Sequence, residues 1–195
     1  MDLFRKLSTP EKIQDFLDAM PINHEHGGET CTSPAHTLER KTAHCLEGAL
    51  LAAAALWSHG HEPLLLNLKS SPGDDDHAVA LFRRNGRWGA ISKTNHAVLR
   101  YRDPIYATPR ELALSYFHEY FLNTTGKKTL LAYSKPFNLK RFGKKWITAD
   151  TNLWDIAYAL RKSPHTLIVP TKDRRRLRPA SAIERKAGSL VEWRP

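Results

Sequence analysis

The chain has few cysteines and no long hydrophobic run, and both absences narrow the classes of protein to which it can belong. Two of its 195 residues are cysteines, Cys31 and Cys45, so a framework of several disulfides is excluded and a reducing, cytoplasmic setting is expected. The alanine-rich run at 49–57 is far shorter than the roughly 20 residues that a membrane-spanning helix needs. We therefore expect no membrane partner.

The first twenty residues also lack the apolar stretch of a secretory signal, and they predict an amphipathic helix instead. A Ser-Thr-Pro-Glu sequence at 8–11 supplies an N-cap, a proline for the first turn and a capping-box glutamate. The helix is expected to end before Pro21. Residues 21–37 are rich in glycine, proline, threonine and histidine, which predicts a loop.

Length and composition favour one globular domain. The hydrophobic content is 41%, with charges of both signs, which is typical of a chain that buries a core. Within the single domain 1–195 we distinguish an N-terminal helix and loop (1–39), a core (40–104) and a helical, basic C-terminal part (105–195).

The net charge of +10 is concentrated late in the chain, at 127–145 and 171–179. Such a surface either is simply solvated or attracts an acidic partner or nucleic acid. No recognised RNA-binding signature accompanies it.

The order of predicted elements indicates an α+β fold. A helix is expected to start between Arg40 and Cys45 and to end near Gly60. Apolar residues occupy nearly every side of this helix, so it should be central and buried. Asn85-Gly86 between two apolar runs predicts a hairpin. A central buried helix packed on an antiparallel sheet follows from this order. Strands are predicted at 63–68, 77–84, 88–92, 97–101, 130–133 and 166–170, helices at 108–121 and 150–163, and an extended tail after 170.

Three polar residues at element ends suggest chemistry. Cys45 stands at a helix start, where the helix field and unpaired N–H groups favour a thiolate, although a buried cysteine can also serve packing alone. His77 opens a strand after an acidic loop, and Ser92 ends the paired strand. Thiol acyl transfer needs a thiolate, a histidine that accepts and returns a proton, and a group that orients the imidazole.

The stretches HCLEGALLAAAALWSHGHEPLLLNL and DHAVALFRRNGRWGAIS resemble the transglutaminase-like superfamily, relatives of papain-fold cysteine enzymes. The resemblance covers about residues 40–100. It implies a transglutaminase-like core, Cys45 as nucleophile, His77 as general base and no cofactor or metal. It also implies action on an amide or related acyl bond, in a peptide, protein or other amide-containing substrate.

The chain departs from this family at the third residue, because Ser92 stands where the family has an aspartate. With a two-residue turn, Val79 opposes Ser92 and His77 opposes Thr94, so Ser92 lies on the face of His77, one diagonal step away. Asn95 points the other way unless the strand has ended or bulged, but asparagine can also orient a histidine. Ser92 and Asn95 therefore both remain candidates.

Other interpretations stay open beside this one. A serine adds no negative charge to stabilise an imidazolium, so the fold can also carry an inactive site and serve as a basic nucleic-acid- or partner-binding module. The aspartates at 74–76, which directly precede His77, either compensate for the negative charge that Ser92 lacks or form a solvated loop. His44 is expected to cap or pack. A zinc site is a further alternative, although no standard ligand spacing is present. Its candidate ligands are His24, His26, Cys31, His36, His44 and Cys45.

Overall fold

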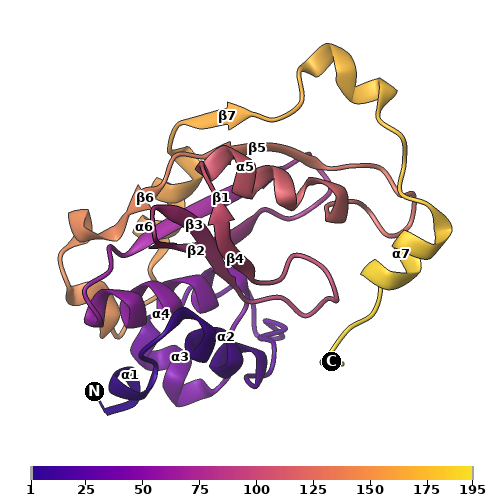
Figure 1. The fold of residues 1–195 in the computed structure, drawn as a ribbon. Helices are drawn as coiled ribbons and strands as arrows, with labels where there is room; N and C mark the ends of the chain where they lie inside the picture. The colour runs from indigo at the N-terminus through magenta and orange to yellow at the C-terminus, as the bar shows by residue number, and fades with distance from the viewer. Residues whose placement is uncertain (1, 195) are drawn as a thin grey trace.

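A computed structural model describes residues 2–194, and it shows helices packed around one antiparallel sheet (Figure 1). The sheet has seven strands in the order β4-β3-β2-β1-β5-β7, and β6 pairs with β1 outside this path. Every pair of neighbouring strands is antiparallel, so the predicted α+β class with an antiparallel sheet is confirmed. The strands are β1 (Leu64–Ser70), β2 (His77–Arg84), β3 (Arg87–Ser92), β4 (Arg102–Tyr106), β5 (Leu130–Ser134), β6 (Phe137–Asn138) and β7 (His165–Leu167).

The helices lie around this sheet, with α1 to α4 gathered on one side and α5 on the other (Figure 1). Among the helices between residues 2 and 194, none combines the length and hydrophobicity that crossing a bilayer requires. The α-helices are α1 (Asp2–Lys6), α2 (Pro10–Asp18), α3 (Pro34–Arg40), α4 (Cys45–Ser58), α5 (Pro109–Ser115), α6 (Trp154–Lys162) and α7 (Ala182–Gly188). The 3-10 helices are η1 (Phe117–Glu119), η2 (Leu139–Phe142), η3 (Lys145–Ile147) and η4 (Thr171–Arg176).

Both faces of the central strands are buried, which explains why their sequences are apolar throughout. In β2, Ala80 and Phe82 belong to the core shared with α4, whereas Val79 and Leu81 belong to the core beneath α5. Successive side chains of a strand point to opposite faces, so one strand supplies both cores.

Helix α4 is the buried central helix that the sequence predicts. Its residues from Glu47 to Leu56 are all buried, because the sheet covers one side and α2 and α3 cover the other. The helix ends at Ser58, close to the predicted end near Gly60, and Gly60 has a φ of +87°, a left-handed conformation that glycine adopts without strain. His61 N–H closes the end by donating to the Leu56 carbonyl at 3.0 Å.

The hairpin of β2 and β3 also forms as predicted. Asn85 and Gly86 both have positive φ, at 50° and 76°, as a two-residue type I′ turn requires. The register pairs Val79 with Ser92, but the pairing ends there and does not extend to Thr94.

Two predictions in the N-terminal and central parts are wrong. Residues 34–37 were expected to be a loop but belong to α3, whose N-cap Ser33 accepts a bond from His36 N–H at 3.3 Å. Residues 97–101 were expected to be a strand, yet the strand in this region is β4, which begins at Arg102. Leu99 explains the second difference, because its φ of +61° breaks an extended path.

The tail after Pro170 was predicted to be extended, and it instead contains η4 and α7. Helix α7 begins with a capping box in which Ser181 N–H donates to the Glu184 carboxylate at 2.6 Å. This capping box is a local start signal in the sequence that the prediction of an extended tail overlooked.

Gly48 in α4 is required by a close approach of Lys93, whose side chain is fully buried. A Cβ at residue 48 would lie 2.4 Å from the Lys93 Cβ. We expect Gly48→Ala to lower the free energy of unfolding by about 2 kcal/mol, because overpacking outweighs the helix propensity of alanine. Urea denaturation measures this change.

Gly27→Ala is the matched control, since no atom lies within 4 Å of its added Cβ. Its stability should stay within about 0.5 kcal/mol of the wild type. A Gly48→Ala protein as stable as the wild type would contradict the close approach.

Candidate active site

Cys45 is the first residue of α4 and is half-buried. The N–H groups of the first helical turn have no partners within the helix, and the positive end of the helix field favours an anion there. The Cys45 N–H forms no hydrogen bond with any residue between 2 and 194. Its thiol donates a long hydrogen bond to the Asp76 carbonyl, 4.0 Å from Sγ.

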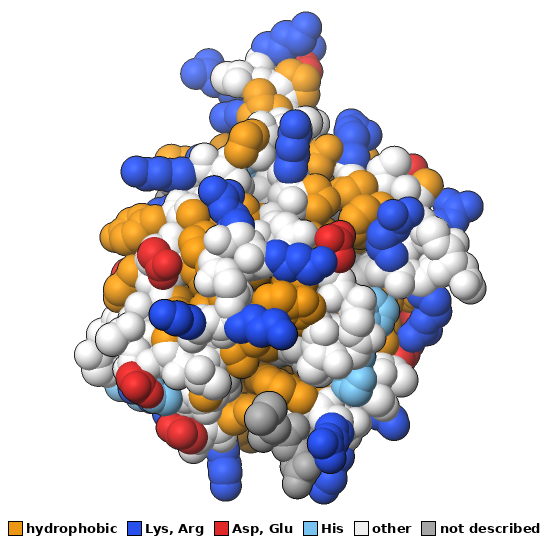
Figure 2. Space-filling view, turned by 90° about the vertical axis from the view of Figure 1, so that its left-hand side faces the viewer, with side chains coloured by type: hydrophobic (Ala, Val, Ile, Leu, Met, Phe, Trp, Pro, Cys, Tyr) orange, Lys and Arg blue, Asp and Glu red, His pale blue; other side chains and the backbone are white. Residues whose placement is uncertain are grey.

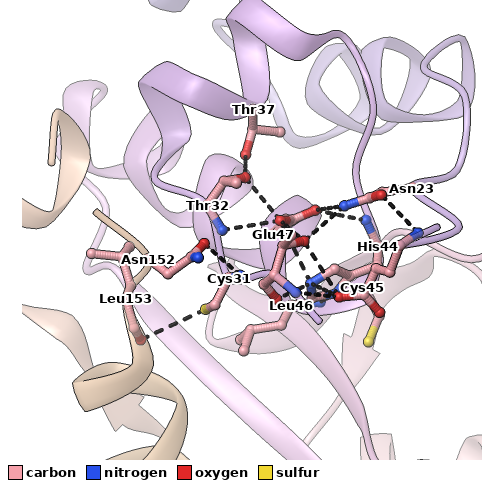
Figure 3. Close-up of polar contacts among 12 residues, drawn as sticks. Asn23, Cys31, Thr32, Thr37, His44, Cys45, Leu46, Glu47, Asn152 and Leu153 are labelled. Carbon is pink, nitrogen blue, oxygen red and sulfur yellow. Dashed lines mark hydrogen bonds and ion pairs between the residues drawn. The ribbon is translucent and has the colours of Figure 1, made fainter. Parts of the chain in front are cut away.

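The Glu47 carboxylate, fully buried, organises the start of α4 (Figure 3). It accepts a hydrogen bond from His44 N–H at 3.1 Å, which is half of a capping box. Thr32 donates both its N–H, at 3.0 Å, and its hydroxyl, at 2.9 Å. Asn23 and Thr30 complete the set with side-chain bonds of 3.1 and 2.9 Å. Figure 3 shows the Cys45 side chain pointing away from this cluster.

His44 is the N-cap, as the sequence led us to expect, and both of its ring nitrogens contact backbone. Nδ1 accepts from Leu46 N–H at 3.2 Å, and Nε2 lies 2.9 Å from the Thr30 carbonyl. Burial opposes protonation of His44, but Cys45 and Glu47 outweigh it and raise the pKa of His44 to about 9. Protonating Nδ1 would break the cap, so charge at His44 and capping by His44 compete.

His77 and Ser92 come together at the ends of β2 and β3. His77 Nε2 lies 2.8 Å from Ser92 Oγ, and Ser92 Oγ donates to the Leu99 carbonyl at 2.5 Å. Because the serine proton goes to Leu99, Ser92 must accept from Nε2–H. The unprotonated nitrogen of a neutral His77 is then Nδ1.

Helix α2 fixes the backbone of Ser92. The Gln14 side chain accepts from Ser92 N–H at 2.9 Å and donates to the Ser92 carbonyl at 2.8 Å. The next residue, Lys93, is anchored to the end of the same helix and to the residues after it, since its ammonium donates to the carbonyls of Leu17, at 2.9 Å, and Met20. Residues 92 and 93 therefore cannot shift without disturbing α2.

The pKa values of the two cysteine thiols are shifted in opposite directions. Burial raises the pKa of Cys45, but hydrogen bonding and charge from His44 and His77 outweigh burial and lower it to about 5. Burial, aided by Glu47, raises the pKa of Cys31 to about 12. Cys31 Sγ contacts the Leu153 carbonyl at 3.6 Å (Figure 3), so it packs as a neutral thiol.

Asn95, the other candidate for orienting His77, is engaged elsewhere. Its side chain donates to the Trp193 carbonyl and accepts from Trp193 N–H, both at 2.8 Å. Ala97 N–H donates to the Leu190 carbonyl at 3.1 Å. The C-terminal segment thus holds the loop that follows β3.

Two hollows of about 520 and 440 Å³ meet at Cys45, and residues 74–76 line both. Glu119 adds an acid to the first hollow, and Glu25 and Glu29 add two to the second. The lysine of the first hollow is Lys93, whose ammonium is already bound to backbone carbonyls. The second hollow also contains Arg161, but acidic side chains outnumber lysine and arginine in both hollows, although the net charge of the chain is +10.

The candidate zinc ligands do not converge. Within residues 2–194 no three side chains of His, Cys, Asp or Glu form a group that could hold a metal ion. His24 stacks on His26, and His36 lies 3.8 Å from the Asp150 carboxylate.

Several residues that build the site were not identified from sequence. The Leu99 carbonyl is a backbone group, and Gln14 lies 78 residues from its partner. A side-chain pattern carries no signal for either contact. The direction of the Ser92 hydroxyl is likewise a property of the folded chain.

No protein-family model matches the chain, and no curated protein matches it. What the site does must therefore be argued from its own chemistry.

We expect Glu47→Gln to destabilise the protein by about 3 kcal/mol, because the carboxylate receives only donors and an amide N–H₂ would face them unpaired. Charge from His44 and bonds from Thr32 and Asn23 outweigh burial and lower the pKa of Glu47 below its ordinary 4.5. The stabilisation is therefore complete above this value and is lost as the pH falls through the lowered pKa. Urea denaturation should show that the wild type loses this increment on acidification and the variant does not. Equal stabilities at neutral pH would contradict the role of Glu47.

The acids around Cys45 should select reagents by charge. We expect a cationic methanethiosulfonate to modify Cys45 roughly tenfold faster than an anionic one of matched size, with a ratio that falls as salt is added. Asp75→Asn should reduce the ratio, since Asp75 is exposed in both hollows. Asp103→Asn, an exposed residue of β4, is the control. A ratio near one at low salt would contradict an acidic hollow.

Proposed function

We propose that the protein is a thiol-dependent enzyme that acts on an amide or related acyl bond, with Cys45 as nucleophile, on a transglutaminase-like core. The observation that carries the proposal is the Ser92 hydroxyl, which is 2.8 Å from His77 Nε2 and donates to the Leu99 carbonyl. This arrangement leaves Nδ1 for Cys45, and the lowered pKa of Cys45 supports the thiolate form. A thiolate paired with a positioned imidazolium is what acyl transfer to sulfur needs.

In the first step the Cys45 thiolate attacks the carbonyl carbon and an Sγ–C bond forms. The carbonyl electron pair moves to oxygen, and the Cys45 N–H, which is free at the helix start, is a donor for that oxyanion. As the carbonyl re-forms, the bond to the amine breaks and the leaving nitrogen takes the proton from His77 Nδ1. A thioester on Cys45 and a neutral His77 remain.

In the second step a water molecule or an amine attacks the thioester. His77 Nδ1 accepts its proton, the C–S bond breaks, and the thiolate and imidazolium are restored. Ser92 accepts from Nε2–H throughout and orients the ring, but as a neutral group it contributes less to the stability of the imidazolium than a carboxylate would. We therefore expect a slower enzyme than one with an aspartate at residue 92.

A second candidate function is binding without catalysis, through the basic C-terminal part. Lys172, Arg175 and Arg176 of η4 are exposed, and Figure 2 shows basic side chains on the segment that projects from the top of the molecule. Such a projection suits an acidic partner or nucleic acid. An inert Cys45 would favour this alternative.

The test is the rate of Cys45 alkylation by iodoacetamide against pH, with the two cysteines resolved by peptide mapping. We expect an apparent pKa of about 5 for Cys45 and no reaction of Cys31 at neutral pH. His77→Ala should raise the apparent pKa, because it removes an interaction that favours the thiolate. A Cys45 that titrates near 8.5 with or without His77 would refute the proposal.

Acylation is measured on the same proteins with p-nitrophenyl acetate as the acyl donor. An acetyl group should appear on Cys45 of the wild type and not in Cys45→Ala. Turnover of that thioester should depend on His77. Cys31→Ala is the matched control, and it should acylate like the wild type, since Cys31 is fully buried.

A further inference from the structure

Glu119 and Tyr120 follow α5, in the C-terminal part of the chain, yet both bind backbone beside the candidate site. The Glu119 carboxylate accepts from Leu99 N–H at 2.7 Å. The Tyr120 hydroxyl donates to the Asp75 carbonyl, two residues before His77. Two adjacent residues thus hold the loop after β3 and the loop before β2.

Leu99 adopts a backbone conformation that is unfavourable for a leucine. Its φ of +61° lies in the left-handed region, which is costly for a leucine and persists only where surrounding contacts impose it. Two of these contacts are the Glu119 bond to its N–H and the Ser92 bond to its carbonyl. Without Glu119 we expect the Leu99 backbone to relax, which would turn its carbonyl away from Ser92.

Arg102 keeps the carboxylate of Glu119 in place. It lies 2.7 Å from the same oxygen of Glu119 that binds Leu99, and it donates to the Arg100 carbonyl at 3.3 Å. Its guanidinium stacks on the Tyr116 ring at 4.2 Å. The carboxylate is therefore fixed by packed groups of α5 and β4.

Tyr120 holds the opposite side of the site. The side chain is 3% exposed, and burial raises its pKa, so the phenol keeps its proton and stays a donor to Asp75. The loop at 74–76 connects directly to His77, so this bond fixes the start of β2. Because these contacts act on the backbone beside the site, neither Glu119 nor Tyr120 has to contact a substrate to affect the position of His77 or Ser92.

The geometry assigns Glu119 as a positioning residue that holds His77 in the tautomer with its proton on Nε2, and Tyr120 as a positioning residue that fixes the backbone before His77. This inference rests on the proposed function for its catalytic meaning. The link is the Ser92 hydroxyl, because while it donates to the Leu99 carbonyl it must accept from His77 Nε2–H. If the carbonyl moves away, the hydroxyl is free to donate to Nε2, which would place the imidazole proton on Nδ1. A neutral His77 of that tautomer cannot take a proton from Cys45.

The direct test is the tautomer of His77, read from the ¹⁵N shifts of its ring nitrogens in the neutral form and assigned with His77→Gln. We expect the Nε2–H tautomer in the wild type and a mixture with Nδ1–H in Glu119→Ala. Glu119→Gln should retain the wild-type tautomer, because its amide oxygen can still accept from Leu99 N–H. Tyr120→Phe should shift the mixture less than Glu119→Ala, since it leaves the Ser92–Leu99 bond intact.

The matched control is Glu111→Ala in α5. Glu111 also accepts a backbone N–H, from Ala107 at 2.8 Å, but it is exposed and lines neither hollow. It should leave the tautomer unchanged. Urea denaturation identifies any variant whose spectrum reports unfolding. If Glu119→Ala fails to fold, Glu119→Leu takes its place, because leucine retains most of the side-chain volume but offers no acceptor to Leu99 N–H.

Alkylation of Cys45 gives the second readout. Glu119→Ala should slow it about tenfold below the pKa of the thiol, as a rise of about one pKa unit would, while Glu119→Gln and Glu111→Ala stay near the wild type. An Nε2–H tautomer and an unchanged alkylation profile in folded Glu119→Ala would overturn the inference. An inert Cys45 with the tautomer shift still present would instead refute the proposed function and leave the positioning role standing.

Discussion

The buried carboxylate of Glu47 is the interaction on which the arrangement of the site depends. It lies in the first turn of α4, and through His44, Thr32 and Asn23 it fixes where that helix begins. Cys45 owes its place at the helix terminus to this start. A buried carboxylate that receives only hydrogen-bond donors is stable as an anion, and its charge also bears on both histidine and cysteine chemistry nearby. One residue therefore serves capping and loop attachment, and it raises the pKa of both His44 and Cys31.

The other half of the site is built by contacts between parts of the chain that are distant in sequence. Ser92 takes its backbone position from Gln14 of α2 and the direction of its hydroxyl from Leu99. Each contact restricts a different freedom of the same residue. A serine lacks the negative charge of an aspartate. Here, however, its only hydroxyl proton is donated to the Leu99 carbonyl, so the adjacent imidazole must carry its proton on Nε2.

Local signals in the sequence predicted the elements that carry the candidate site. The start of α4, its end just before Gly60 and the Asn85-Gly86 turn depend on residues close together in the chain. The pairing of Val79 with Ser92 followed from that turn. Two failures are different in kind. The helix α3 carried a readable Ser-Pro start that was overlooked, whereas the left-handed Leu99 is imposed by distant partners. No propensity marks a leucine for that conformation. The contacts of Glu119 with Leu99 and of Asn95 with Trp193 are also long-range, so no local pattern in the sequence predicts them.

The two hydrogen bonds between Asn95 and Trp193 affect the order in which parts of the chain fold during synthesis. Cys45 and the β2–β3 hairpin leave the ribosome well before the residues that bind Asn95 and Ala97 have been made. During that interval the loop after β3, which includes Leu99, lacks its C-terminal partner. The thiol is therefore synthesised early but gains its complete surroundings late. Until residues 190–193 have joined the fold, a nascent chain lacks part of the structure around the candidate site.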